Sequence, residues 1–156
     1  MITSANARQG HVDVLVDTPV WSLALRRQQP GKLSAAEIRY KRELTELLAE
    51  NRARIIGPVR QEILSGVRHR AQLERLRTLL RHYDCEPLST ADFEAAAEAG
   101  NLCREKGLTG SPVDYLICAV ALSRRWVVFT LDRDFERFAH VLSVPLHAPR
   151  NLNPLH

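Results

Sequence analysis

The sequence predicts an α/β fold with a mainly parallel sheet of four to five strands and helices on both faces. Short β-branched apolar runs alternate with longer helical patterns, the order that strand–helix–strand units give. The chain has 156 residues, of which 45% are apolar, which suits one packed domain and is too short for two. We expect that domain over residues 12–147, after a flexible segment at 1–11 and before a C-terminal tail at 148–156.

The first expected elements are a strand and two helices. The apolar run at residues 12–16 predicts the strand. Thr18 as N-cap and Pro19 at the first helical position predict a helix directly after it. Ser34 and Glu37 have capping-box spacing and therefore predict the start of a second, longer helix.

The middle of the chain predicts two more strands, each close to a helix. Residues 54–56 form the second expected strand, which ends in the β-branched pair Ile55-Ile56, and a Gly-Pro pair directly after them begins a helix expected through Val67. Residues 72–82 are expected to be helical, and residues 85–88 form the third expected strand.

The last third of the chain gives the clearest pattern. Ser111 is an N-cap candidate with proline directly after it, and the helix expected there leads into a β-prone run at 126–131. The remaining expected elements are a helix at 92–106 capped by Ser89 or Thr90, a short helix at 133–140, and an edge strand at 144–146.

Several classes of protein are excluded by composition. No run of 18 or more apolar residues is present, so we expect no membrane span. The first residues are polar and lack an apolar signal region, so secretion is not expected. Cys85, Cys103 and Cys118 form no CxxC pair and indicate reduced thiols. We therefore expect a cytoplasmic protein.

The basic residues are mostly arginine. The formal net charge is +4, and all but three of the 22 cationic side chains are arginines, whose planar forks suit phosphate and carboxylate. This fits a nucleic acid or an acidic protein partner, and it equally fits a bias in codon usage. The arginine stretch Arg68–Arg81 has two interpretations that stay open, a surface that grips RNA phosphates or a solvated helix face.

Four acidic residues stand out from the others. Most glutamates lie on helix faces beside basic residues, where solvation explains them. Asp17 and Asp132 instead end strands, Glu62 lies one turn inside a helix that follows a strand, and Asp114 follows the Ser111 cap. Because the carboxyl ends of parallel strands meet at one edge of a sheet, we expect Asp17, Glu62 and Asp132 to converge there. Asp114 joins them if its helix starts at the same edge.

Such a cluster has a chemical consequence. A single acid at a helix start is explained by the helix dipole, at roughly 0.3–1 kcal/mol. Two carboxylates about 4 Å apart, however, repel by roughly 4 kcal/mol at an effective dielectric near 20. Such a group persists by binding protons or cations, and oxygen ligands select a hard ion such as Mg²⁺ or Mn²⁺. A divalent ion held in this way supports phosphodiester hydrolysis.

Four segments together resemble the motifs of PIN-domain ribonucleases, and the chain is similar in size to the VapC toxins of type II toxin–antitoxin systems. The segments lie at residues 14–18, 58–66, 114–119 and 130–135. The resemblance implies a PIN-like α/β/α sandwich and an endoribonuclease that depends on Mg²⁺ or Mn²⁺. It also implies a homodimeric toxin that an antitoxin inhibits by covering the acidic site.

By position, the resemblance assigns the family's catalytic acidic quartet to four residues and a supporting role to the hydroxyl of Thr18. Three of the quartet would hold the metal, and the fourth would act as a ligand or orient the attacking water. Asp134 matches a further acid that binds a second ion or only caps a helix. The quartet is Asp17, Asp114 and Asp132 for the metal, with Glu62 as the fourth acid.

Two other functions remain open on the sequence alone. A receiver-like phosphoacceptor domain also clusters aspartates at strand ends, but none of the three lysines lies after a late strand as it would require. A PIN-like scaffold that binds RNA or protein without cleaving it would keep the same fold. Metal-dependent RNA cleavage separates the nuclease from both.

Overall fold

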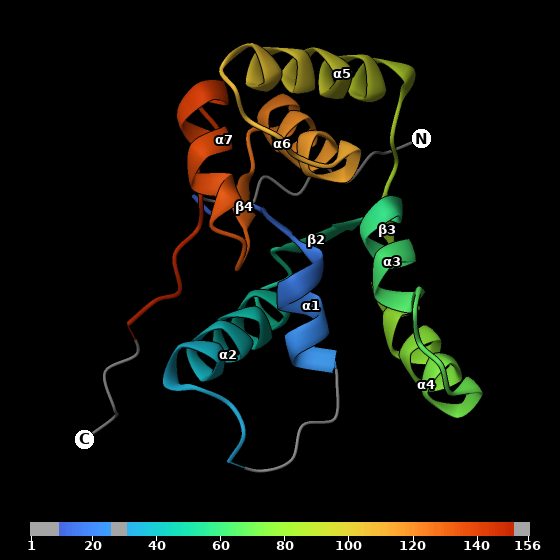
Figure 1. Cartoon of the computed structure of the whole chain (residues 1–156). Coiled ribbons are helices and arrows are strands. Elements are labelled where there is room, and N and C mark those ends of the chain that lie inside the picture. Colours follow the sequence, from blue (N-terminus) through green and yellow to red (C-terminus); the bar gives the residue numbers. More distant parts are fainter. Residues whose placement is uncertain (1–9, 26–30, 152–156) are drawn as a thin grey trace, which may run out of the picture.

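A computed structural model of the chain describes residues 10–25 and 31–151. Within these ranges the chain forms four strands and seven helices in alternating order (Figure 1). The elements are β1 (Val14–Val16), α1 (Thr18–Leu25), α2 (Ala35–Ala49), β2 (Ala53–Ile56), α3 (Gly57–Leu64), α4 (Arg70–Leu80), β3 (Cys85–Glu86), α5 (Thr90–Glu105), α6 (Pro112–Arg124), β4 (Val127–Phe129) and α7 (Asp134–Leu142).

The sheet has the order β3-β2-β1-β4, and all of its pairings are parallel. This confirms the α/β class with a parallel sheet. The expected fifth strand is reduced to a single parallel bridge between Leu146 and Val128. The amide of Val128 donates to the carbonyl of Pro145, but proline has no N–H with which to continue the ladder.

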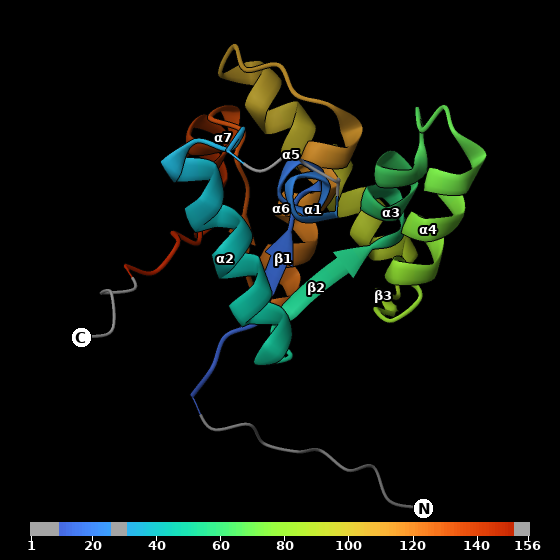
Figure 2. The ribbon, with the colours of Figure 1, turned by 90° about the horizontal axis from the view of Figure 1, so that it is seen from below.

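The helices cover both faces of the sheet. Helices α6 and α7 lie on one face with α5 outside α6, whereas α1 and α2 lie on the other face (Figures 1 and 2). The α3–α4 pair lies beside the end of the sheet that β2 and β3 form (Figure 2). The chain is therefore a three-layer α/β/α sandwich, as the resemblance implied.

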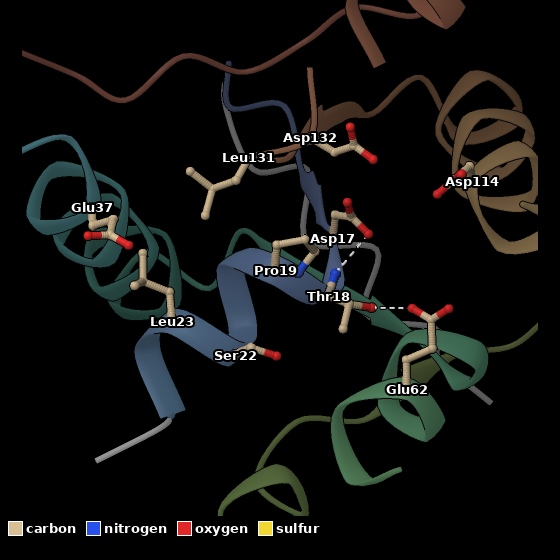
Figure 3. A pocket seen from close by; sticks show the side chains of 10 residues that line it. All are labelled: Asp17, Thr18, Pro19, Ser22, Leu23, Glu37, Glu62, Asp114, Leu131 and Asp132. Atoms are coloured by element: carbon tan, nitrogen blue, oxygen red, sulfur yellow. Dashed lines mark hydrogen bonds between the residues drawn. The ribbon is translucent and has the colours of Figure 1, made fainter. Parts of the chain in front are cut away.

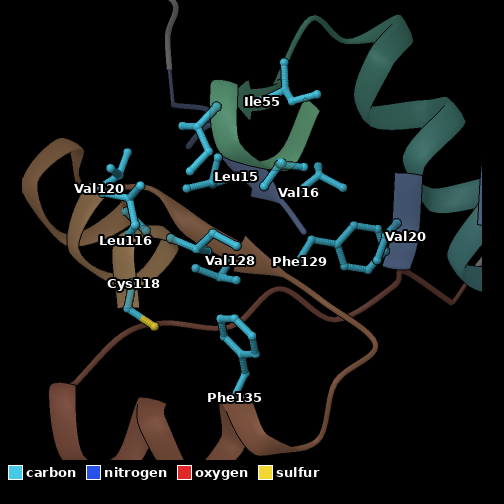
Figure 4. Packing of buried hydrophobic residues seen from close by; sticks show 14 of the residues in the cluster. Leu15, Val16, Val20, Ile55, Leu116, Cys118, Val120, Val128, Phe129 and Phe135 are labelled. Atoms are coloured by element: carbon cyan, nitrogen blue, oxygen red, sulfur yellow. The ribbon is translucent and has the colours of Figure 1, made fainter. Parts of the chain in front are cut away.

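The core lies between the central strands and α6. All three residues of β1 are completely buried, and Figure 4 shows two of them, Leu15 and Val16, beside Val128 and Phe129 of β4. Helix α6 is buried along Tyr115–Ala121, because the sheet covers one side and α5 the other. A helix that is buried on all sides is apolar on every face. Because this packing holds α6 in place, it also fixes the position of the polar first turn of α6.

Helix ends follow the sequence signals closely. The capping box of α2 forms as expected, since the Glu37 carboxylate accepts from the amide of Ser34 at 2.8 Å. Helix α3 ends at Leu64, three residues before the expected end at Val67, and Gly66 adopts a positive φ of 76° just beyond it. None of the helices in the described ranges has the length and apolar character that a membrane crossing requires.

The segment after α7 is attached to α2. Glu43 of α2 is 1% exposed and accepts hydrogen bonds from Nε2 of His147 at 2.7 Å and from Nε of Arg150 at 3.0 Å. Arg150 also pairs with Glu50. The C-terminal tail expected at 148–156 is thus described only as far as Asn151, and residues 1–9 of the expected flexible segment lie outside the described ranges.

Candidate active site

Asp17 lies at the junction of β1 and α1 and is only 5% exposed. One carboxylate oxygen accepts from the amide of Thr18 at 2.8 Å, and the other accepts from the hydroxyl of Thr130 at 2.7 Å. Burial raises the pKa of Asp17 to about 6, against the opposing effect of these two hydrogen bonds, and the charges of Asp114 and Glu62 raise it further. Asp17 is therefore a buried acid whose partners among the described residues are neutral donors and not a cation.

Glu62 reaches the same place from α3. Its carboxylate accepts a hydrogen bond of 2.6 Å from the hydroxyl of Thr18. The expected N-cap role of Thr18 is wrong, because Thr18 is the first residue of α1 and its hydroxyl holds Glu62 instead of capping the helix. Thr18 thus links the first two acids, one through its amide and the other through its side chain.

Asp114 has a local structural role as well as a place in the site. Its carboxylate accepts from the amide of Ser111 at 2.8 Å, and its amide donates to the Ser111 hydroxyl, which completes the capping box of α6. Burial raises the pKa of Asp114, the Ser111 hydrogen bonds oppose this, and the charges of Asp132 and Glu62 add to it. The capping box of α6 therefore holds the Asp114 carboxylate in place near the carboxylates of Asp132 and Glu62.

Asp132 follows β4 and is joined to Asp17 through Thr130. The Thr130 hydroxyl donates to Asp17 and accepts from the amide of Asp132 at 3.0 Å. Thr130 is not among the site residues predicted from the sequence. The signal was present, because a hydroxyl two residues before an acid is able to bond to that residue's backbone amide.

The four predicted acids line one pocket of about 510 Å³ (Figure 3). They come from four separate parts of the chain: the end of β1, helix α3, the first turn of α6 and the loop after β4. Glu37 and Ser22 also line the pocket, and neither was predicted there from the sequence. Among the described lining residues there are five carboxylates and no lysine, arginine or histidine.

Two groups of predicted residues do not line this pocket. Asp134 instead pairs with Arg137 in the first turn of α7, and its amide donates to Asp132. None of the arginines of the stretch Arg68–Arg81 lines it either. Within that stretch, Arg75 donates to the carbonyl of Leu25 and Arg77 pairs with Glu74.

The donor set fits a hydrated hard cation. Among the described residues, no three His, Cys, Asp or Glu side chains lie close enough together to enclose a metal ion by themselves. The pocket nevertheless offers only oxygen donors and an excess of negative charge. Mg²⁺ usually keeps several water ligands and needs only one or two carboxylates, so this arrangement suits an ion held partly through water.

The fold and the pocket define a class of protein: a parallel α/β sandwich with an acidic pocket at the carboxyl edge of its sheet. The model of the PIN domain family matches residues 14–141. The chain therefore belongs to the PIN domain family, which favours the nuclease over the receiver-like alternative. A comparison with curated protein sequences gave no match.

Several solved structures share the fold at low sequence identity. VapBC2 from Rickettsia felis bound to a DNA fragment from its promoter is 20% identical, with a TM-score of 0.66 over 86% of this chain and 96% of that chain. FitAcB from Neisseria gonorrhoeae is 19% identical, with a TM-score of 0.68 over 89% and 99%. A toxin–antitoxin complex from Klebsiella pneumoniae is 22% identical, with a TM-score of 0.54 over 79% and 90%.

Proposed function

We propose that this chain is an endoribonuclease dependent on Mg²⁺ or Mn²⁺ and that it is the toxin of a toxin–antitoxin pair. The observation that carries the proposal is the pocket that Asp17, Glu62, Asp114 and Asp132 line without a basic residue among the described lining. Membership in the PIN domain family supports a nuclease, and the toxin–antitoxin complexes among the structural neighbours support the toxin role.

Each acid has a role in the proposed reaction. Asp17, Asp114 and Asp132 would hold the divalent ion, some of them through water, and the ion would supply charge neutralisation at the phosphoryl oxygens. Glu62, which the Thr18 hydroxyl holds, orients the attacking water. Thr130 positions Asp17 by its hydrogen bond.

The proposed cleavage is a hydrolysis by in-line attack. The water oxygen forms a bond to phosphorus, the bond from phosphorus to O3′ breaks, and a proton goes to the leaving O3′. The products are a 5′-phosphate and a 3′-hydroxyl, as the family resemblance implies. No covalent intermediate with the protein is needed, which agrees with a pocket that carboxylates dominate.

The proposal includes two protein partners. An antitoxin would cover the acidic pocket and so keep RNA from the carboxylates. A second copy of the chain would form the homodimer that the resemblance implies. Copurification of an antitoxin with the chain, and the molecular mass of the free chain in solution, test these two parts separately from the chemistry.

The chemistry is tested with Asp114→Asn and assorted RNAs in the presence of Mg²⁺ or Mn²⁺. Asparagine keeps an oxygen that accepts from the Ser111 amide, so the cap and the fold should remain. We expect cleavage to fall at least about a hundredfold, because one charge at the metal is lost. Asp84→Asn, an exposed acid that does not line the pocket, is the matched control and should cleave like the wild type.

Other outcomes would contradict the proposal. Cleavage that persists in EDTA, or that Asp114→Asn leaves intact, would argue against this site. Stable phosphorylation by a small phosphodonor would indicate the receiver-like alternative. Salt-sensitive RNA binding without products in any metal would indicate the scaffold that does not cleave.

A further inference from the structure

A second cavity lies next to the acidic pocket. It has a volume of about 480 Å³, and Leu131 and Asp132 line both cavities. Its other walls come from α2, the start of α7 and the segment after Pro145, and they include Tyr40, Arg133 and His147. A chain of nucleotides that crosses Asp132 would therefore enter both cavities.

The aromatic walls of this second cavity are fixed by the core. Tyr40 is stacked on Phe129, with ring centroids 5.1 Å apart and planes 7° apart. The ring of His147 meets the same Phe129 edge-on at 5.2 Å. His147 is held further by its bond to Glu43 and by its amide, which donates to the carbonyl of Val128. A rigid cavity binds a flat ligand with little loss of side-chain entropy.

The charge of the lining favours a neutral group inside the cavity. Asp132 and Glu136 line it against one arginine, Arg133, so the carboxylates outnumber the guanidinium and disfavour a phosphate that lies within the cavity. Tyr40, Leu131 and Leu146 give it aromatic and aliphatic surface. This combination suits a nucleobase, which has a flat π-face, polar edges and no charge.

A cation is available for the phosphate beside that base. Arg133 lines the cavity and is exposed, and no described side chain pairs with its guanidinium. It lines the second cavity only, and it directly follows Asp132, which lines both. An arginine fork at this place suits a phosphodiester oxygen.

We propose that this second cavity receives the base of the nucleotide next to the cleaved phosphodiester, with Arg133 on the flanking phosphate. The inference rests on the proposed ribonuclease function, and the nucleotide that binds in this way is unpaired. A base that is paired in a duplex cannot leave the stack to enter a cavity without a further cost in free energy.

The test fills the cavity with a side chain. Ala148 is exposed and lines the cavity, so Ala148→Phe should occupy the space of a base without disturbing the core. We expect kcat/KM for a single-stranded RNA oligonucleotide to fall about tenfold, mostly through KM. Ala71→Phe, on the exposed side of α4 and outside both cavities, is the control and should leave it unchanged.

An abasic oligonucleotide makes the test specific to a base. After the cleaved linkage is mapped with the wild type, the base on each side of it is removed in turn. The wild type should cleave one of these abasic substrates about tenfold more slowly than the intact oligonucleotide. On that substrate, the Ala148→Phe variant should cleave no more slowly than the wild type. Circular dichroism melting of both variants shows that they fold.

Arg133→Gln gives a second measurement that does not depend on the phenylalanine variant. Loss of one phosphate contact should lower the slope of log KM against log salt concentration by about 0.7. Equal kcat/KM for Ala148→Phe and Ala71→Phe, together with an unchanged salt slope, would overturn this inference alone. A wild-type chain that cleaves no RNA in either metal would overturn the proposed function and this inference with it.

Discussion

Two carboxylates of this protein are buried almost equally but lie in opposite surroundings. Glu43 is 1% exposed, and burial would raise its pKa, but hydrogen bonds from His147 and Arg150 outweigh this effect and hold the pKa below its ordinary value. Asp17 is 5% exposed, and burial raises its pKa to about 6 because its partners are neutral. The fold therefore supplies a counter-charge to one acid and leaves the other without one.

The Glu43 arrangement is repeated elsewhere in the molecule. Asp92 of α5 is also 5% exposed, and both of its carboxylate oxygens accept from Arg124, which holds the pKa of Asp92 far below its ordinary range. Buried acids that only support the fold are thus neutralised from within the chain. The acidic pocket differs, because no basic residue among its described lining neutralises its carboxylates. We therefore expect a bound cation to neutralise them.

The largest expected change in stability comes from breaking a neutralised group. Glu43→Ala removes the acceptor of His147 and Arg150 and should lower the free energy of unfolding by about 3 kcal/mol. For a chain of this size the melting temperature should fall by about 6–12 °C. Glu46→Ala, an exposed glutamate on the same helix, should change it by less than about 2 °C. Equal melting temperatures for the two variants would contradict a structural role for Glu43.

In the acidic pocket, removal of a carboxylate is expected to raise the free energy of unfolding, not to lower it. Because the pKa of Asp17 is raised in the folded state, the stability that this group contributes is full below about pH 4 and is lost as the pH rises through about 6. Asp17→Asn should therefore raise the free energy of unfolding at pH 7 by about 2–3 kcal/mol when no divalent ion is present.

Urea denaturation at pH 7 and at pH 3.5 checks this expectation, with Asp84→Asn as the control. The difference between Asp17→Asn and wild type should nearly disappear at the lower pH, where Asp17 is neutral in the folded chain and mostly neutral in the unfolded chain. An Asp17→Asn chain that is less stable than wild type at pH 7 would show that its charge supports the fold, as the charge of Glu43 does.

A smaller effect is expected from the hydroxyl that links two of the acids. Thr130→Val removes the donor that lowers the pKa of Asp17 and the acceptor of the Asp132 amide. The acid limb of the profile of cleavage rate against pH should move to higher pH, with a loss of about three- to tenfold at pH 6. Thr130→Ser keeps the hydroxyl and should restore the profile. If serine and valine variants have the same profile, Thr130 acts only through packing.

The acidic pocket could be predicted from the sequence because simple rules place its members. Asp17 directly follows β1 and Asp132 lies in the loop after β4, which ends at Phe129, before the expected end at 131; the carboxyl ends of these parallel strands share one edge. Asp114 follows a cap and a proline that fix a helix start. The predicted edge strand at 144–146 was too long, because Pro145 stops the ladder after one bridge.

The neutralised groups could not be predicted in the same way. Glu43 looks like one more glutamate on a basic helix, and its partners His147 and Arg150 lie more than 100 residues away in the chain. No periodicity or cap indicates such a contact, since it depends on how the last segment packs against α2. Tertiary packing decides whether an acid on a helix is exposed or buried. Local sequence decides how far that acid lies from the start of the helix.

The most direct measurement is an isothermal titration of the chain with Mn²⁺ at pH 7. Wild type and Glu43→Ala should bind the ion saturably with the same affinity, whereas Asp17→Asn and Asp114→Asn should bind it at least about tenfold more weakly. Equal Mn²⁺ binding by wild type and both aspartate variants would contradict the claim that these carboxylates form a binding site for a divalent cation.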